Sequence, residues 1–190
     1  ERQLYERITA IVRRGMLKQV GHRALVDQLT LQQLQLAAGS SVHATLSGLS
    51  KLAQRVLPEA YKNEIVSVLA AANKLAENYS LVCSKARVTS EIIRNFDDKV
   101  LIFTRFRETH DFLVSFLQSQ HLNVATFNGS MKRSEKDAAI DQFKGEAQVL
   151  VSSESGGEGR NLQFCRAIIN YDLPWNPMRI EQRVGCIHCI

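Results

Sequence analysis

Two different spacings of apolar residues divide the chain. Over roughly the first half, apolar positions recur every three or four residues, which is the period of a helix that packs one face against a core. Examples of such faces are Leu4, Ile8 and Ile11; Leu46, Leu49 and Leu52; and Ile65, Val68 and Leu69. The pattern predicts helices throughout residues 1–96 and no convincing strand there.

The pattern changes after Asp97 and Asp98. Short apolar runs that are typical of strands buried on both faces now alternate with amphipathic helical stretches. The predicted strands are 99–106, 122–127, 148–152 and 167–171, and the predicted helices are 107–120, 134–144 and one that begins at 176–177. This alternation is typical of a parallel sheet covered by helices. The sequence therefore predicts an α/β fold for residues 97–190, preceded by an all-helical segment.

A glycine-rich loop follows the third predicted strand and contains Gly156, Gly157 and Gly159. Ligands bind α/β proteins at the carboxyl ends of parallel strands, and glycine lets the backbone turn its N–H groups toward a phosphate. A tight turn between two strands accounts for the glycines equally well. A dinucleotide-binding fingerprint requires a further glycine at the position of Leu162, so that class is excluded.

The last predicted helix begins with good signals. Asn176 is a favoured N-cap residue, and Pro177 is favoured at the first helical position. On a helix that starts there, Gln182, Cys186 and Cys189 are spaced i, i+4 and i+7, so they share one face.

These stretches resemble the motifs of superfamily 2 helicases. SSESGGEGRNLQ (152–163) is similar to motif V, and NYDLPWNPMRIEQRVGCIHCI (170–190) resembles the segment that leads into motif VI. FTRF (103–106) resembles motif IV, and TFNGSM (126–131) resembles a family segment in which His is common at the position of Asn128. The likeness is strongest to Swi/Snf-like translocases, especially the bacterial branch that includes the ATPase that recycles RNA polymerase.

The resemblance implies the second RecA-like lobe of an ATP-driven nucleic-acid motor. In the family, ATP lies between two lobes, and the first lobe holds the phosphates and Mg²⁺. This sequence contains no Gly-Lys-Ser/Thr run and no Asp-Glu pair of the Walker B kind. We therefore expect the parent protein to hydrolyse ATP and this chain alone not to do so.

The resemblance also implies roles in nucleotide binding. Gly159 corresponds to the motif V backbone contact near the γ-phosphate, Gly157 to another nucleotide-binding residue of that motif, and Asn161 to a position near the ribose. Gln182 corresponds to the first residue of motif VI. Asn161 could instead cap a short turn.

Nucleic-acid contacts are implied at three further positions. Ser153 and Gly129 correspond to contacts with phosphates, for which a hydroxyl or a backbone N–H suffices. Ser153 could instead simply end a strand. Arg105 lies near the carboxyl end of the predicted strand 99–106 and could line the same groove, although ordinary surface charge explains it as well. The same two explanations apply to Lys132, Arg133 and Arg160.

The chain departs from the family pattern at Cys186 and Cys189, where the family has two arginines. The guanidinium groups there offset charge that develops on the transferred phosphoryl group, which a neutral thiol cannot do. The alternative function is therefore a non-catalytic RecA-like scaffold or nucleic-acid-binding module. A zinc site of these cysteines with His188 is disfavoured, because structural zinc usually needs four ligands.

Composition narrows the remaining possibilities. The 190 residues are 45% hydrophobic and carry a net charge of +5, which suits one globular domain with a helical extension and a polyanionic partner. We expect duplex DNA as that partner ahead of RNA, the first lobe of the same protein as a second partner, and RNA polymerase as a further candidate.

The expected location is the cytoplasm of a bacterial-type cell. No apolar stretch is long enough for a membrane span, no signal peptide is recognisable, and the four cysteines suit a reducing compartment. The chain starts without Met and stops within a motif, so we expect a piece of a longer protein.

Overall fold

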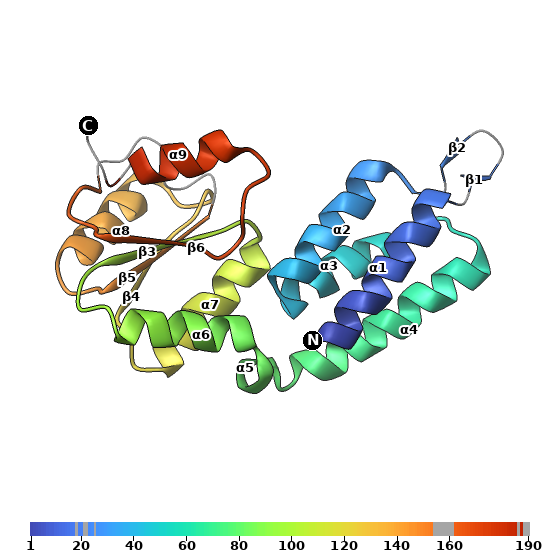
Figure 1. Cartoon of the computed structure of the whole chain (residues 1–190), viewed down its shortest axis with the longest axis horizontal. Helices are drawn as coiled ribbons and strands as arrows, with labels where there is room; N and C mark the ends of the chain where they lie inside the picture. Colours follow the sequence, from blue (N-terminus) through green and yellow to red (C-terminus); the bar gives the residue numbers. More distant parts are fainter. Residues whose placement is uncertain (18, 21–22, 25, 154–161, 186, 188–190) are drawn as a thin grey trace. The chain divides into compact units, whose positions relative to one another are not determined.

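The computed structural model describes the whole chain except residues 18, 21–22, 25, 154–161, 186 and 188–190 (Figure 1). The chain divides into two units, Glu1–Cys83 and Ser84–Ile190. The helix Ser84–Arg94, which the sequence pattern grouped with the helical segment ending at residue 96, belongs to the second unit. The Gln148 side chain donates to the Ile93 and Phe96 carbonyls at 3.2 and 2.9 Å, which ties this helix to the sheet.

The first unit is built from helices, as predicted. Its elements are α1 (Arg2–Leu17), β1 (Gln19–Val20), β2 (Arg23–Ala24), α2 (Gln28–Ser40), α3 (Val42–Ala53), α4 (Glu59–Ala76) and α5 (Tyr79–Val82). The expectation of no strand before residue 97 is wrong, because β1 and β2 pair in antiparallel orientation. Each of these strands has two residues, which is too short for alternation to be visible in the sequence.

The helices of this unit pack through their apolar faces, and polar residues cap the helix ends. Ile11, Leu31, Leu49 and Ile65 are fully buried. Ser41 ends α2 and begins α3, and its side chain accepts the backbone N–H of Ala44. None of the described helices, in either unit, is both long and apolar enough to cross a bilayer.

The second unit confirms the predicted α/β fold. Its elements are α6 (Ser84–Arg94), β3 (Val100–Thr104), α7 (Arg107–Ser119), β4 (Val124–Phe127), α8 (Arg133–Lys144), β5 (Val149–Ser153), β6 (Ala167–Asn170) and α9 (Pro177–Gly185). The strands form a parallel sheet in the order β4-β5-β3-β6. Fully buried runs such as Val100–Thr104 lie in its interior, as expected for parallel strands covered on both faces.

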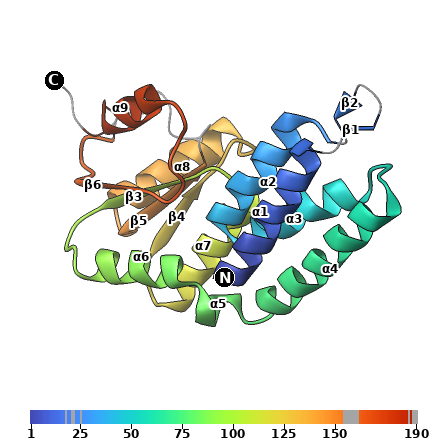
Figure 2. The same cartoon turned by 45° about the vertical axis from the view of Figure 1, so that its right-hand side comes forward.

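Helices cover both faces of this sheet, with α6 and α7 on one side and α8 and α9 on the other (Figures 1 and 2). Alternate strand residues point to opposite faces, so Leu101, Phe103 and Leu150 form one core with Ile140 and Phe143 of α8. On the other face, α7 contacts β3, β4 and β5. All four parallel strands therefore end at one edge, where their loops emerge.

Candidate functional site

Three adjacent strands bring the predicted nucleic-acid residues to one edge of the sheet. β3 and β5 stay in register up to their last residues, Thr104 and Ser153, and β4 pairs with the other side of β5. Arg105 follows β3 directly, and Gly129 lies two residues beyond β4. Gly129 is exposed, while Arg105 and Ser153 are half-buried. We call Arg105, Gly129 and Ser153 the carboxyl edge.

The main chain after β3 is held in place by Asp172. The Asp172 Oδ2 accepts the backbone N–H of Arg105 at 2.9 Å, and its Oδ1 lies 3.4 Å from the Lys85 ammonium. Lys85 also lies over the Tyr171 ring, 4.1 Å from its centroid. Because the bond to Arg105 uses the main chain, replacing the arginine side chain would not remove it. Sequence reasoning missed this carboxylate, although its place just after a predicted strand was a usable signal.

The loop after β4 is closed by Asn128. Its Oδ1 accepts the backbone N–H and the hydroxyl of Ser130 at 3.1 and 2.7 Å, which is an Asx turn. The Asn128 N–H donates to the Met131 sulfur at 3.3 Å. These bonds surround Gly129, so asparagine at a position where the family often has histidine gives this loop its own local turn.

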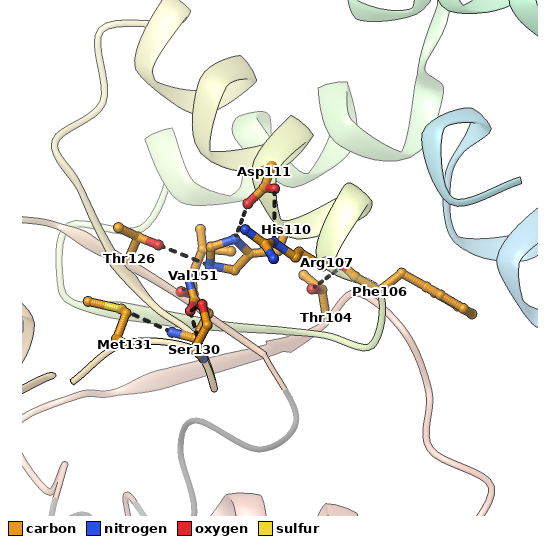
Figure 3. A network of polar contacts seen from close by, with 10 residues as sticks. Thr104, Phe106, Arg107, His110, Asp111, Thr126, Ser130, Met131 and Val151 are labelled. Atoms are coloured by element: carbon orange, nitrogen blue, oxygen red, sulfur yellow. Dashed lines mark hydrogen bonds and ion pairs between the residues drawn. The ribbon is translucent and has the colours of Figure 1, made fainter. Parts of the chain in front are cut away.

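A buried histidine links α7 to two strands (Figure 3). His110 is 2% exposed, and its Nε2 lies 3.0 Å from the Thr126 hydroxyl and 3.2 Å from the Val151 carbonyl oxygen. Its Nδ1 lies 3.0 Å from Asp111, whose carboxylate also pairs with Arg107 at 3.8 Å. Sequence reasoning missed His110, although its spacing from the inward-facing residues of the same helix indicated burial.

The start of α9 agrees with the sequence prediction, because the Asn176 side chain accepts the Met178 N–H at 3.1 Å. Gln182 of this helix is exposed. Its neighbour Arg183 is buried, donates to Asn170 at the end of β6 and lies 4.5 Å from the centroid of the Phe103 ring. Arg183, which sequence reasoning also missed, therefore anchors α9 to the sheet.

The other predicted site residues lie outside the described residues. They are the motif V residues Gly157, Gly159 and Asn161 and the motif VI residues Cys186 and Cys189. The predicted helical face that joins Gln182 to the two cysteines, and the disfavoured zinc site with His188, fall there as well.

The two described cysteines are packed in the interior. Cys83 and Cys165 are both buried and unbridged. The Cys165 thiol donates to the Lys99 and Ala167 carbonyls, each at 3.3 Å, and burial raises its pKa. A raised pKa keeps the thiol protonated at neutral pH, so Cys165 is suited to packing rather than to nucleophilic chemistry.

The described part of the site offers hydrogen-bond donors and positive charge. The N-cap residue of α7, Phe106, makes no side-chain capping bond, and that helix begins beside the carboxyl edge. Helix N-termini, loop N–H groups and basic side chains are the groups that proteins use to hold phosphates. The geometry is therefore suited to holding a polyanion.

Residues 84–190 match the family of the helicase conserved C-terminal domain. The chain belongs to this family. The uncharacterized ATP-dependent helicase YqhH of Bacillus subtilis is 41% identical over 160 residues, which are 84% of this chain and 28% of the relative. The RNA polymerase-associated protein RapA of Pectobacterium carotovorum is 39% identical over 95 residues, 48% of this chain and 10% of that protein. The chain thus spans under a third of these relatives.

Solved structures show the same fold. The structure of the C-terminal part of the Fun30 ATPase domain aligns with the whole of this chain over 76% of the Fun30 chain, with a TM-score of 0.64 and 18% identity. The structure of the Hef helicase domain of Pyrococcus furiosus aligns with 97% of this chain over 48% of the Hef chain, with a TM-score of 0.54 and 19% identity. These structures confirm the predicted RecA-like fold. The family match and the bacterial relatives YqhH and RapA confirm the resemblance to bacterial Swi/Snf-like helicases.

Proposed function

We propose that this chain is the second motor lobe of an ATP-dependent nucleic-acid translocase. In this proposal the carboxyl edge holds the nucleic-acid backbone, and motifs V and VI contribute to an ATP site shared with a first lobe. The observation that carries the proposal is the meeting of Arg105, Gly129 and Ser153 at one edge, in a chain of the helicase family.

The carboxyl edge is suited to binding a nucleic-acid backbone, because its groups can bind phosphates without contacting the bases. A main-chain N–H, a hydroxyl and a guanidinium group bind phosphates irrespective of sequence. A solved structure of yeast Dbp5 bound to RNA and ADP BeF₃ has a TM-score of 0.51 to this chain, with 25% identity over 55% of it. Because the bacterial relatives YqhH and RapA are more similar to this chain, at 41% and 39% identity, the proposal keeps duplex DNA ahead of RNA.

The nucleotide part of the proposal rests on α9 and the glycine-rich loop. Gln182 is exposed on α9, and Arg183 fixes that helix to the end of the sheet. Gly157, Gly159 and Asn161 would contact ATP, and the first lobe would hold Mg²⁺. The name of the relative RapA supports RNA polymerase as a candidate partner of the parent protein.

The binding test compares two arginine variants of this chain. We expect weak, sequence-independent binding of duplex DNA that is lost at high salt. Arg105→Ala should weaken it and reduce the slope of log affinity against log salt by about 1, because one phosphate contact is lost. Arg166→Ala removes the same charge beside the opposite, amino-terminal end of β6 and should leave the slope unchanged. Equal slopes for all three proteins would contradict the assignment of the edge.

The nucleotide test uses ATP hydrolysis. This chain should give no turnover above background, with or without DNA. In a two-lobed protein with a working first lobe, the double substitution Cys186→Arg and Cys189→Arg should raise DNA-stimulated hydrolysis by at least about tenfold, since an arginine finger is worth about 10³–10⁵ in rate. Equal activity of the cysteine and arginine forms would remove the finger assignment.

A second function is favoured by those two cysteines. A lobe without its arginines could serve as a non-catalytic scaffold or nucleic-acid-binding module. The same two-lobed protein separates the functions. A scaffold would bind DNA with the salt dependence given above, and its cysteine form would hydrolyse ATP no faster than background, whereas a motor would keep some DNA-stimulated hydrolysis in its cysteine form.

A further inference from the structure

His110 joins the first turns of α7 to two strands near the carboxyl edge (Figure 3). Its Nε2 reaches Thr126 of β4 at 3.0 Å and the carbonyl of Val151 in β5 at 3.2 Å. An imidazole that is 2% exposed would destabilise the fold unless its nitrogens were paired. The ring is therefore a defined contact between helix and sheet rather than an incidental polar residue.

The two ring nitrogens have different structural consequences. Val151 O and the Asp111 carboxylate can only accept, whereas the Thr126 hydroxyl can donate or accept. A ring protonated at Nδ1 donates to Asp111 and accepts from Thr126, and a ring protonated at Nε2 donates to Val151 O. In either form, Nε2 makes the contact with the strands. Nδ1 contacts the next residue of its own helix.

Both strand contacts lie just before the loops of the carboxyl edge. Val151 is two residues before Ser153, and Thr126 is three residues before Gly129. Arg105 is the third residue of the carboxyl edge. The helix that carries His110, α7, begins two residues after it, with Phe106 as the N-cap residue. One ring thus connects the segments that carry all three edge residues.

We propose that His110 is a positioning residue for nucleic-acid binding at the carboxyl edge. The ring itself touches no ligand. Through Nε2 it holds α7 against β4 and β5, so that the three edge residues face one phosphate chain at a constant spacing. This inference rests on the proposed function of the edge.

Two substitutions at His110 separate its two nitrogens. In His110→Gln the amide lies far enough along the side chain to reach the place of Nε2, and it can both donate to Val151 O and accept from Thr126. In His110→Asn the shorter amide reaches only the place of Nδ1, beside Asp111. Glutamine should therefore restore the contact with the strands, and asparagine should not.

His121 provides a matched control at the far end of α7. It is exposed and has a φ of 63°, a left-handed conformation that asparagine tolerates well. His121→Asn is thus the same chemical change in the same unit, away from the carboxyl edge. It should leave nucleic-acid binding and the edge unchanged.

The primary measurement is the affinity of each folded protein for duplex DNA at low salt. We expect His110→Asn to lose about fivefold in affinity, the scale of one hydrogen bond, and His110→Gln to stay within about twofold of the unsubstituted chain. Amide hydrogen exchange at Ser130 and Ser153 should rise in the asparagine variant alone. If His110 had only a structural role, its substitution would lower the unfolding temperature. DNA affinity and amide exchange measured below that temperature would then stay unchanged.

The outcomes also separate this inference from the function on which it rests. Equal DNA affinity for the glutamine and asparagine variants would overturn the positioning role. If the unsubstituted chain binds no nucleic acid, the proposed function fails, and amide exchange then decides the role of the histidine. In that case, unchanged amide exchange at Ser130 and Ser153 in His110→Asn would overturn the positioning role of His110.

Discussion

The two units differ in what they bury. Among the described residues of the helical unit, the buried serine and threonine side chains lie at one helix junction: Ser40, Ser41 and Thr45. In the α/β unit, buried polar side chains extend from helices to the ends of strands: Thr89, Ser90, Thr104, Thr109, His110, Ser152 and Arg183. The polar groups of the helical unit stabilise the ends of its own helices. Those at the strand ends of the parallel sheet lie where such folds bind ligands.

The units also differ in charge. Residues 1–83 contain ten basic and six acidic residues, a net +4, and residues 84–190 contain fourteen and thirteen, a net +1. Most of the basic balance of the chain therefore belongs to the helical unit. A polyanion that binds the α/β unit would be held by the arrangement of groups at its edge, because the net charge of that unit is close to neutral.

The largest expected effect tests whether the two units are stabilised separately. Leu49 of the helical unit and Leu101 of the sheet are both fully buried, so truncation of either to alanine should cost about 2–5 kcal/mol. Residue-resolved hydrogen exchange should show Leu49→Ala lowering protection in residues 1–83 and Leu101→Ala lowering it in residues 84–190. A loss of protection spread evenly over both units by either change would contradict the division.

The next effect tests how closely the helices pack. A Cβ on Gly15 would lie 2.6 Å from the Tyr61 hydroxyl and 3.1 Å from the Leu31 methyl groups. Gly15→Ala should therefore destabilise the chain by about 1–3 kcal/mol, as overpacking does. Gly39, also helical, has nothing within 4 Å of such a Cβ, so Gly39→Ala should stabilise by about 0.5–1 kcal/mol. Denaturant titration measures both, and equal signs would refute the packing argument.

Tyr61 should make the helical unit sensitive to alkali. Burial raises its pKa from 10.0 to about 12, with the nearby Glu64 acting in the same direction. Its contribution is therefore complete below pH 10 and is lost as pH rises through the folded pKa, on the order of 1 kcal/mol by about pH 11. The Tyr61→Phe variant cannot ionise there and should lack this part of the loss. Parallel stability curves for the two proteins above pH 10 would show that the assignment is wrong.

The smallest effect concerns a cap on the surface. The Arg55 guanidinium beside Asp27, helped by hydrogen bonds from Thr30, holds the pKa of that carboxyl well below its ordinary 3.8. Its stabilisation is present above that ordinary value and is lost as pH falls below it. Asp27→Asn keeps an oxygen for the Thr30 N–H, bonded at 2.8 Å in the unsubstituted chain, but loses the charge. Thermal unfolding should show a slight deficit for asparagine near neutral pH that closes in acid.

Much of the fold was predictable because its signals are local. The run Val100–Thr104 reads as a strand without knowledge of its neighbours, and Asn176 with Pro177 marks the start of α9. The hairpin of β1 and β2 was not predictable in this way, since two residues carry no period. The grouping of α6 with the sheet was hidden for a related reason, because amphipathicity shows that a face is buried but not against what.

The candidate site was predictable only in part. The sequence by itself placed Arg105, Gly129 and Ser153 at or just beyond the carboxyl ends of strands, and parallel strands end at a common edge. Only the tertiary structure decided that Asp172 holds the Arg105 main chain, that Arg183 anchors α9, and that His110 joins α7 to β4 and β5. Helix and strand periods arise from neighbouring residues, whereas these hydrogen bonds join residues that chain folding alone brings within about 3 Å.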